Sequence, residues 1–294
     1  MSKIVAIILV NYNGYLDTLE CVKSIKATLN LNYKIIIVDN NSKDSKKILE
    51  DKYLNRNCDL IMLEENIGFS GGNNKGIIYA KEHYNPDFYM LLNNDTVIEK
   101  NTISVLQDIY EKNNNIGIAT CQINYFSHPE IVWFGGGKFD FNTGIADMPG
   151  LGKHERYHEK GQREITFATG CLFFISKDVI ENAGLLDESF FLYSEDAEYC
   201  CRLIKLGYKI LYTTDTKIYH KVSASTGTYS RLQQYYMFRN NCYMIKRFCK
   251  YPILGFLKRF YRTAKEMKRG EYQISNIKMA WRDYKRGVIG KVDI

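Results

Sequence analysis

The sequence of 294 residues has no apolar run long enough to cross a bilayer. Its N-terminal run Ile4–Val10 stops at Asn11 and is followed by no small-residue cleavage site, so we interpret it as a first strand and not as a signal peptide. The eight cysteines form no C-x-x-C pair and have no metal-ligand spacing. They favour buried, reduced thiols, and therefore a folded cytoplasmic protein.

Two nucleotide-binding fingerprints are also absent. The glycine-rich stretch 68–76 is neither G-x-G-x-x-G nor a Walker loop, which argues against a dinucleotide-dependent oxidoreductase and a P-loop phosphotransferase. The stretch lies between a predicted strand and a predicted helix, where backbone N–H groups can face an anion. A tight turn is the alternative interpretation.

Positive charge is concentrated near the C-terminus. Of the total net charge of +7, the segment 246–291 holds +11, from 14 Lys and Arg against three acidic residues, so the remainder carries −4. This distribution argues against a nucleic-acid partner for the main body. The segments 253–267 and 274–281 are predicted to be basic amphipathic helices, which suit peripheral binding to the inner face of a membrane. A solvated helical bundle or a homodimer contact is the alternative.

The first third of the chain alternates strands and helices. Apolar runs of strand length are followed by polar clusters, which predicts a parallel sheet wound by right-handed crossovers. The strands are expected at 4–10, 34–39, 60–63 and 88–92, and the clusters at 11–13, 39–41, 68–76 and 93–95. All four clusters would meet at the ligand-binding edge, where Asp95 could hold a hard cation and phosphate oxygens. For a single cluster, a turn is an equally good explanation.

The later chain predicts further strands and one acidic helix start. We expect strands at 116–120, 167–175, 208–213 and 217–220, and an irregular excursion across 133–162 that is either a binding loop or surface decoration. Ser194 is predicted to cap a helix whose first turn contains Glu195 and Asp196. The helix dipole alone would explain these two acidic residues.

These motifs, in this order, resemble the donor half of family 2 glycosyltransferases. The matching segments are 10–13, 38–42, 66–74 and 91–96. The resemblance implies a GT-A-type α/β domain in which Asp39 contacts the base or ribose, and Asn11 and Tyr12 border the base. The nucleotide-binding residues expected from it are Asn11, Tyr12, Asn13, Asp39, Asn41, Gly68, Gly71, Asn73 and Asn94.

The resemblance also implies a divalent cation, Mg²⁺ or Mn²⁺, held by Asp95 and His220. Asp95 is the carboxylate of a D-x-D-type motif, although this sequence has Asn93-Asn94-Asp95 in its place. His220 matches a late histidine that completes the metal-diphosphate site. Ser223, Ser225 and Thr226 follow it as candidate phosphate contacts.

The acceptor half carries the remaining implied site residues. Glu195 and Asp196 are similar to the family motif whose aspartate is the catalytic base. The sugar-binding candidates are Trp133, Gly170, Cys171 and Arg239. Tyr235, Tyr236, Arg239 and Asn240 resemble a signature of rhamnosyltransferase-like members, although Arg239 could equally brace a helix.

The implied function is an inverting glycosyltransferase. It would transfer rhamnose from dTDP-rhamnose, or a hexose from a UDP-sugar, to a glycan or lipid-linked acceptor. The expected domains are a GT-A domain at 1–228, with a donor half at 1–120 and an acceptor half at 121–228, and a basic helical extension at 229–294. The alternatives are a nucleotidyltransferase, which would need a glycine- and basic-rich activating loop near its first strand, and a non-catalytic nucleotide-sugar-binding or assembly subunit of a polysaccharide-synthesis complex. Residues 11–14 lack the basic residues of such a loop.

Overall fold

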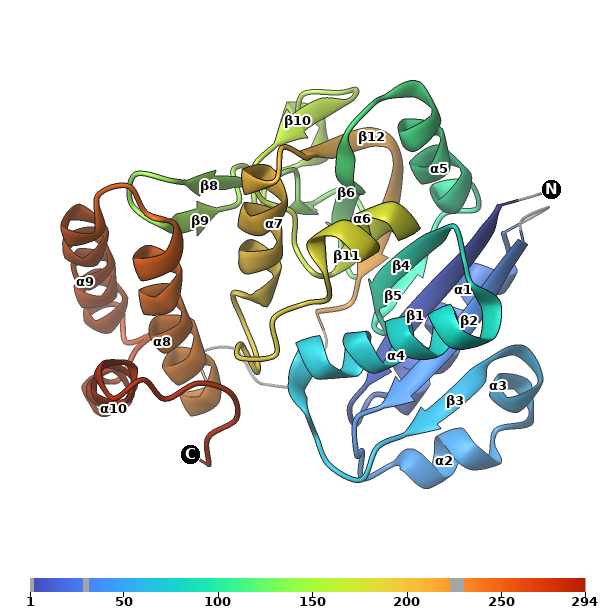
Figure 1. Ribbon diagram of the computed structural model, residues 1–294, viewed down its shortest axis with the longest axis horizontal. Coiled ribbons are helices and arrows are strands. Elements are labelled where there is room, and N and C mark those ends of the chain that lie inside the picture. The colour runs from blue at the N-terminus through green and yellow to red at the C-terminus, as the bar shows by residue number, and fades with distance from the viewer. Residues whose placement is uncertain (1–2, 29–31, 223–229, 294) are drawn as a thin grey trace.

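The computed structural model describes residues 3–28, 32–222 and 230–293 (Figure 1). A mixed sheet of ten strands has the order β10-β12-β6-β11-β4-β1-β2-β3, with β5 paired to β12 and β7 to β6. Its strands are β1 Ile4–Asn11, β2 Asn32–Asp39, β3 Asp59–Met62, β4 Phe88–Asn93, β5 Thr96–Ile98, β6 Ile116–Tyr125, β7 Val132–Phe134, β10 Arg163–Ile165, β11 Leu172–Ser176 and β12 Lys209–His220, and β8 Lys138–Asp140 with β9 Ile145–Asp147 form a separate hairpin.

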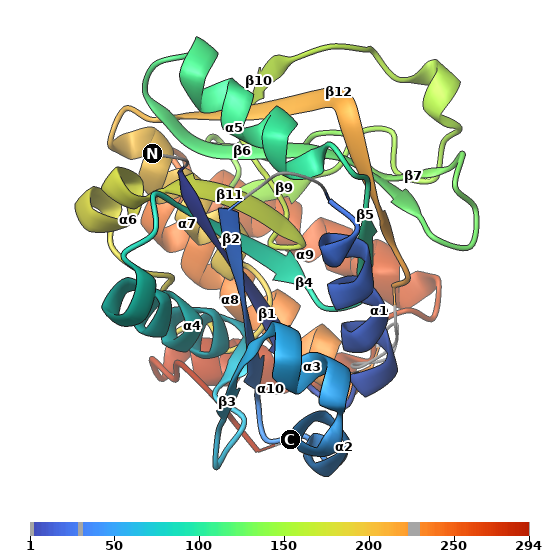
Figure 2. The same ribbon diagram turned by 90° about the vertical axis from the view of Figure 1, so that its right-hand side faces the viewer.

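The helices cover both faces of the sheet and form one separate group. They are α1 Tyr15–Lys26, α2 Ser45–Glu50, α3 Lys52–Asn57, α4 Gly68–Tyr84, α5 Thr102–Lys112, α6 Lys177–Ala183, α7 Glu195–Lys205, α8 Arg231–Phe248, α9 Pro252–Lys268 and α10 Ile274–Lys285, with a 3₁₀ turn at Glu155–Tyr157. Helices α1 and α4 lie on opposite sides of β1 and β2 (Figure 2). None of the described helices is long and apolar enough to span a membrane.

The predicted parallel unit is confirmed. Strand β1 pairs in parallel with both β2 and β4, and β2 pairs in parallel with β3. Their continuous apolar runs are buried on both faces, which is typical of parallel strands covered by helices. The carboxyl ends of β1, β2 and β4 therefore meet at one edge, as Asn11↔Asp39 and Val10↔Asn93 are paired in register.

The second half of the sheet differs from the prediction in two places. The segments 208–213 and 217–220 form one strand, β12, whose register shifts between Thr213 and Lys217. Strand β11 begins at Leu172 and runs antiparallel to β4, so Gly170 and Cys171 precede the strand and do not lie within it. The backbone N–H groups of these two residues bond to the side chains of Asp196 and Thr169.

The glycine-rich stretch is the main correction. Residues 68–76 form the first turns of α4, whereas the sequence predicted a loop there. A Cβ at Gly72 would lie 2.8 Å from the Val10 side chain, and one at Gly76 would lie 2.5 Å from Ile8. The glycines therefore allow α4 to pack closely against β1.

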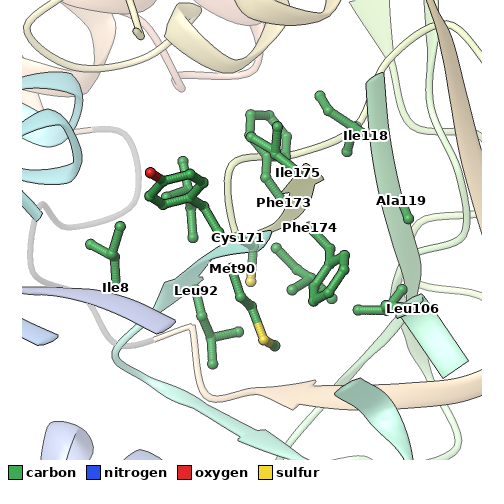
Figure 3. Close-up of a cluster of buried hydrophobic side chains, with 14 of the residues drawn as sticks. Ile8, Met90, Leu92, Leu106, Ile118, Ala119, Cys171, Phe173, Phe174 and Ile175 are labelled. Atoms are coloured by element: carbon green, nitrogen blue, oxygen red, sulfur yellow. The ribbon is translucent and has the colours of Figure 1, made fainter. Parts of the chain in front are cut away.

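The main hydrophobic core joins the two halves of the sheet. Figure 3 shows side chains of β4, β6 and β11 packed together, among them Met90, Ile118 and Phe173, with Leu106 of α5. A second cluster lies between α8 and α10 and includes Tyr235, Phe238 and Ala280. Met244 of α8 belongs to the main core and Phe191 to the second cluster, so contacts cross the predicted domain boundary at residue 228, which stays a prediction.

We expect Gly68→Ala to destabilise the protein by about 2 kcal/mol or more, because Gly68 has a φ of +81° and its Cβ would lie 2.2 Å from the Phe191 carbonyl oxygen. Gly152→Ala is the matched control, since Gly152 has a similar φ of +77° and open space around it. Its cost should be about 1–2 kcal/mol. Urea unfolding measures both, and equal losses would contradict the proposed contact between α4 and Phe191.

Candidate active site

Asn11 is the centre of a buried polar network at the carboxyl edge of the sheet. Its Nδ2 donates to Asp39 Oδ1 at 2.7 Å and to Ser42 Oγ at 2.9 Å. Its Oδ1 accepts from Thr18 Oγ1 and from Asn94 Nδ2, at 2.8 and 3.1 Å. The network joins the ends of β1, β2 and β4, so the structure brings together the predicted residues Asn11, Asp39 and Asn94.

The turn after β1 is fixed by Ser42, a residue that the sequence analysis did not select. Ser42 Oγ accepts from the Asn13 backbone N–H, and Ser42 N donates to Asp39 Oδ2. Asn13 and Asn41 both have positive φ, which asparagine tolerates in tight turns. Tyr12 and Asn41 are exposed beside this network and are free to meet a ligand. Ser42 follows Asp39 in an Asx-type arrangement, a signal that could have identified it.

The start of α4 does not face an anion, contrary to the prediction. The backbone N–H groups of Ile67, Gly68 and Phe69 donate to Asn40 Oδ1, Asn66 Oδ1 and the Phe191 carbonyl oxygen. These donors are already satisfied within the protein.

Two further residues of this stretch are turned inward. A Cβ at Gly71 would meet the Ile67 side chain, and Asn73 is buried with its Nδ2 donating to the Phe69 carbonyl oxygen. The structure therefore does not support a nucleotide contact by Gly68, Gly71 or Asn73.

The predicted metal ligands meet each other. His220 Nε2 lies 3.0 Å from Asp95 Oδ1, and the two residues are 6% and 7% exposed. His220 Nδ1 has no hydrogen-bond partner among the described residues. The Trp133 ring packs edge-on against the His220 ring, with centroids 4.4 Å apart. The carboxylate oxygen and the imidazole nitrogen are in direct contact, and both are atoms of the kind that bind divalent cations.

Lys221 links this pair to helix α1. Its backbone N–H donates to the Asp95 carbonyl oxygen at 2.9 Å, and its Nζ forms ion pairs with Asp17 and Glu20. Asp17 and Glu20 are three residues apart, which is the spacing of a capping box. They do not form one, because α1 begins at Tyr15 and both carboxylates bind Lys221. Nothing in the local sequence signals this contact, which spans about two hundred residues.

Asp196 lies at the start of α7, next to the segment that precedes β11. Its Oδ2 accepts from the Gly170 backbone N–H at 3.1 Å, and its Oδ1 from the Ala197 N–H at 2.8 Å. The neighbouring Cys171 carbonyl oxygen accepts from the Asn93 N–H of β4, at 3.0 Å. The Asn93–Cys171 hydrogen bond therefore links the end of β4, which precedes Asp95, to the segment whose Gly170 binds Asp196. Gly170 and Cys171 lie in this segment, and Cys171 is buried.

Glu195 is almost completely buried beside Asp196. Its Oε2 has no hydrogen-bond partner among the described residues. Burial, followed by the nearby Asp196 carboxylate, raises the pKa of Glu195 well above its ordinary value. Burial also raises the pKa of Asp196, against the opposing effect of its bonds from Gly170 and Ala197. Two neighbouring buried carboxyl groups disfavour double ionisation, and the strongly raised pKa of Glu195 favours its neutral form.

Ser194 precedes these acids without the predicted side-chain cap. It has a left-handed φ of +72°, and Tyr193 before it has a φ of +65°. Asn240 of α8 donates to the Leu192 and Tyr193 carbonyl oxygens, at 2.9 and 2.8 Å. The helical extension thus supports the backbone that presents Glu195 and Asp196.

Arg239, a predicted sugar-binding residue, is enclosed by the protein. Its side chain is fully buried in the C-terminal helices, stacks on Tyr235 and Tyr236, and donates to the Gly290 carbonyl oxygen at 3.0 Å. The alternative interpretation, in which Arg239 braces a helix, fits these contacts. Ser223, Ser225 and Thr226, the candidate phosphate contacts, lie outside the described residues.

The sequence matches the Glycosyl transferase family 2 profile over residues 6–184. The chain belongs to glycosyl transferase family 2. It is similar to the low-salt glycan biosynthesis hexosyltransferase Agl10 of Haloferax volcanii, at 30% identity over 67% of this chain and 60% of that protein. It is also similar to the dTDP-rhamnosyl transferase RfbF of Shigella flexneri, at 24% identity over 84% of this chain and 81% of that protein.

Solved structures confirm the predicted GT-A-type fold of this family 2 member. A crystal structure of GalNAc-T7 with UDP, GalNAc and Mn²⁺ has a TM-score of 0.67 at 16% identity, and the match covers 97% of this chain and 55% of that one. The mannosyltransferase PcManGT from Pyrobaculum calidifontis, in complex with GDP-Man and Mn²⁺, has a TM-score of 0.59 at 12% identity, covering 99% and 77%. The chain thus spans little more than half the length of some proteins it matches.

Glu195→Gln should increase stability at neutral pH, by about 1–3 kcal/mol. Because folding raises the pKa of Glu195, its contribution to stability is fully present below the ordinary carboxylate pKa and is lost as the pH rises. The difference in melting temperature between variant and wild type should therefore grow from pH 5 to pH 8. Glu82→Gln, on an exposed carboxylate of α4, should show no such trend. A constant difference for Glu195→Gln would contradict the raised pKa.

Proposed function

We propose that this protein is an inverting glycosyltransferase that uses a nucleotide-diphosphate sugar. The observation that carries the proposal is the placement of Asp95 and Asp196. Asp95 follows the end of β4, where Asn93 bonds to Cys171 in the segment before β11. Gly170 of the same segment bonds to Asp196. Asp95 is suited to the leaving diphosphate and Asp196 to the attacking hydroxyl, as direct displacement at an anomeric carbon requires.

The donor would bind along the edge formed by Asn11, Tyr12, Asn13, Asp39, Asn41 and Asn94. Tyr12 and Asn41 are exposed there, while Asn11 and Asp39 hold the turn from behind. We propose dTDP-rhamnose or a UDP-sugar as donor, supported by the similarity to a dTDP-rhamnosyl transferase and by the UDP in the GalNAc-T7 structure. We propose Trp133, whose ring packs against His220, as a further contact to the sugar.

Asp95 and His220 would hold a Mg²⁺ or Mn²⁺ ion. Their facing atoms, 3.0 Å apart and buried, fit this role. No group of three or more His, Cys, Asp or Glu ligands occurs in the described part of the chain, so diphosphate oxygens and water would complete the coordination shell. A bound cation would neutralise charge on the leaving diphosphate. The Mn²⁺ in two similar structures supports this proposal.

Asp196 would act as the general base. The acceptor hydroxyl gives its proton to the Asp196 carboxylate while its oxygen bonds to the anomeric carbon, and the bond from that carbon to the diphosphate oxygen breaks. Bonds from Gly170 and Ala197 hold the carboxylate in place, and its raised pKa increases its basicity. A neutral Glu195, which its raised pKa favours, would add no negative charge beside the Asp196 carboxylate. The acceptor would be a hydroxyl of a glycan or of a lipid-linked saccharide.

Asp196→Asn should lower transfer by about 10²–10⁴-fold, because it removes the base. Release of nucleoside diphosphate from a panel of UDP- and dTDP-sugars, with acceptor, measures transfer. Thermal shift with UDP or dTDP should remain as in the wild type. Asp178→Asn, an exposed aspartate in the first turn of α6, is the matched control and should keep full activity.

Two results would contradict this assignment. Loss of nucleotide binding in Asp196→Asn would make Asp196 a structural or donor-site residue. Nucleotide binding by the wild type without turnover of any sugar would instead indicate the non-catalytic assembly subunit.

A further inference from the structure

Helix α9 has polar side chains on its buried face and apolar side chains on its exposed face. Its buried residues include Arg259, Thr263 and Glu266. The apolar residues on the outside are Ile253, Leu254, Leu257 and Tyr261, which are 80%, 49%, 64% and 63% exposed. A surface helix of a soluble protein normally has the opposite arrangement. We call these four residues the outer stripe.

The outer stripe is continuous along the helix. Ile253, Leu257 and Tyr261 are spaced four residues apart, so their side chains follow one another along a single face, and Leu254 lies beside them. Helix α9 forms the outer edge of the molecule in Figure 1. The stripe therefore presents a contiguous apolar surface away from the sheet.

Packing within the helical bundle does not require the outer stripe. On the inner side of α9, Arg259 pairs with Glu266, with an N–O distance of 3.6 Å, and Phe260 packs against Trp281 of α10. Helix α10, also predicted to be amphipathic, differs from α9 because its Ile277 and Ala280 are buried in the bundle. Of α9 and α10, therefore, α9 has the apolar face that contacts no other part of the described structure.

Basic side chains border the outer stripe. Lys250, Lys265 and Lys268 are exposed, and Lys258 and Arg262 on the flank also pair with Asp140 and Asp147 of the β8–β9 hairpin. Lys265 Nζ lies 4.5 Å from the Tyr261 ring centroid. Apolar and aromatic residues bordered by lysine suit the boundary between acyl chains and negatively charged lipid headgroups.

We propose that α9 docks this protein on an anionic membrane surface through the outer stripe and its flanking lysines. The helix has 17 residues and several charges, so it would lie in the interface and not cross it. A second copy of the chain is disfavoured, because a contact through α9 would bring together two segments of net charge +11. The proposal rests on surface chemistry alone and is independent of the glycosyltransferase assignment.

Co-sedimentation of the full chain with vesicles tests the proposal. The wild type should bind vesicles of phosphatidylcholine with 40% phosphatidylglycerol, and added salt should weaken the binding. Leu257→Glu and Ile253→Glu should each lower the partition coefficient by about tenfold or more. Replacing Lys250, Lys265 and Lys268 together by alanine should lower binding to anionic vesicles and leave the weak binding to pure phosphatidylcholine unchanged.

Leu49→Glu is the matched control, because Leu49 of α2 is 50% exposed and lies outside the bundle. It should keep wild-type vesicle binding, and all variants should keep the wild-type melting temperature and nucleotide response. No binding of the wild type to anionic vesicles, or equal losses in Leu49→Glu and Leu257→Glu, would overturn the proposal. Dimerisation of the wild type that Leu257→Glu abolishes, without vesicle binding, would assign the stripe to a second copy instead.

Discussion

The candidate site depends on the position of β4 between β1 and β11. Its parallel pairing with β1 places Asn94 beside Asn11, while its antiparallel neighbour β11 begins just after Gly170 and Cys171. Because this one strand borders both halves, the polar edge at Asn11 and the acidic start of α7 lie close to each other. The core formed by Met90, Phe173 and their neighbours keeps this arrangement rigid (Figure 3).

Several groups at the site are placed at a cost in stability. Glu195 is buried without a hydrogen bond to Oε2, and Tyr193 and Ser194 both have positive φ immediately before it. Such strain persists only where surrounding contacts fix it, and Asn240 provides two of them. The helical extension therefore contributes to the site by holding the backbone that precedes Asp196. Arg239 orients Asn240, because Arg239 Nε donates to Asn240 Oδ1.

The sequence was sufficient for features that depend on local patterns. The apolar runs and the polar clusters that end them identified β1 to β4, their parallel order and the edge where Asn11, Asp39 and Asn94 meet. Features decided by contacts between distant residues could not be predicted in this way. Gly72 and Gly76 predict a loop from the sequence alone. Their role in a helix becomes clear only from the contacts with Val10 and Ile8, which leave no room for a side chain. The burial of Arg239 against Gly290, and the outward orientation of Leu257, likewise depend on how the last three helices pack.

We propose that Asp95 and His220 hold a divalent cation at the edge formed by the ends of β1, β2 and β4. Electron spin echo spectroscopy of Mn²⁺, bound together with UDP or dTDP, tests it most directly. We expect a ¹⁴N coupling from one imidazole, which His220→Gln should remove, whereas His158→Gln, in the loop before β10, should leave it unchanged. A bound Mn²⁺–nucleotide complex without nitrogen coupling in the wild type would contradict the account.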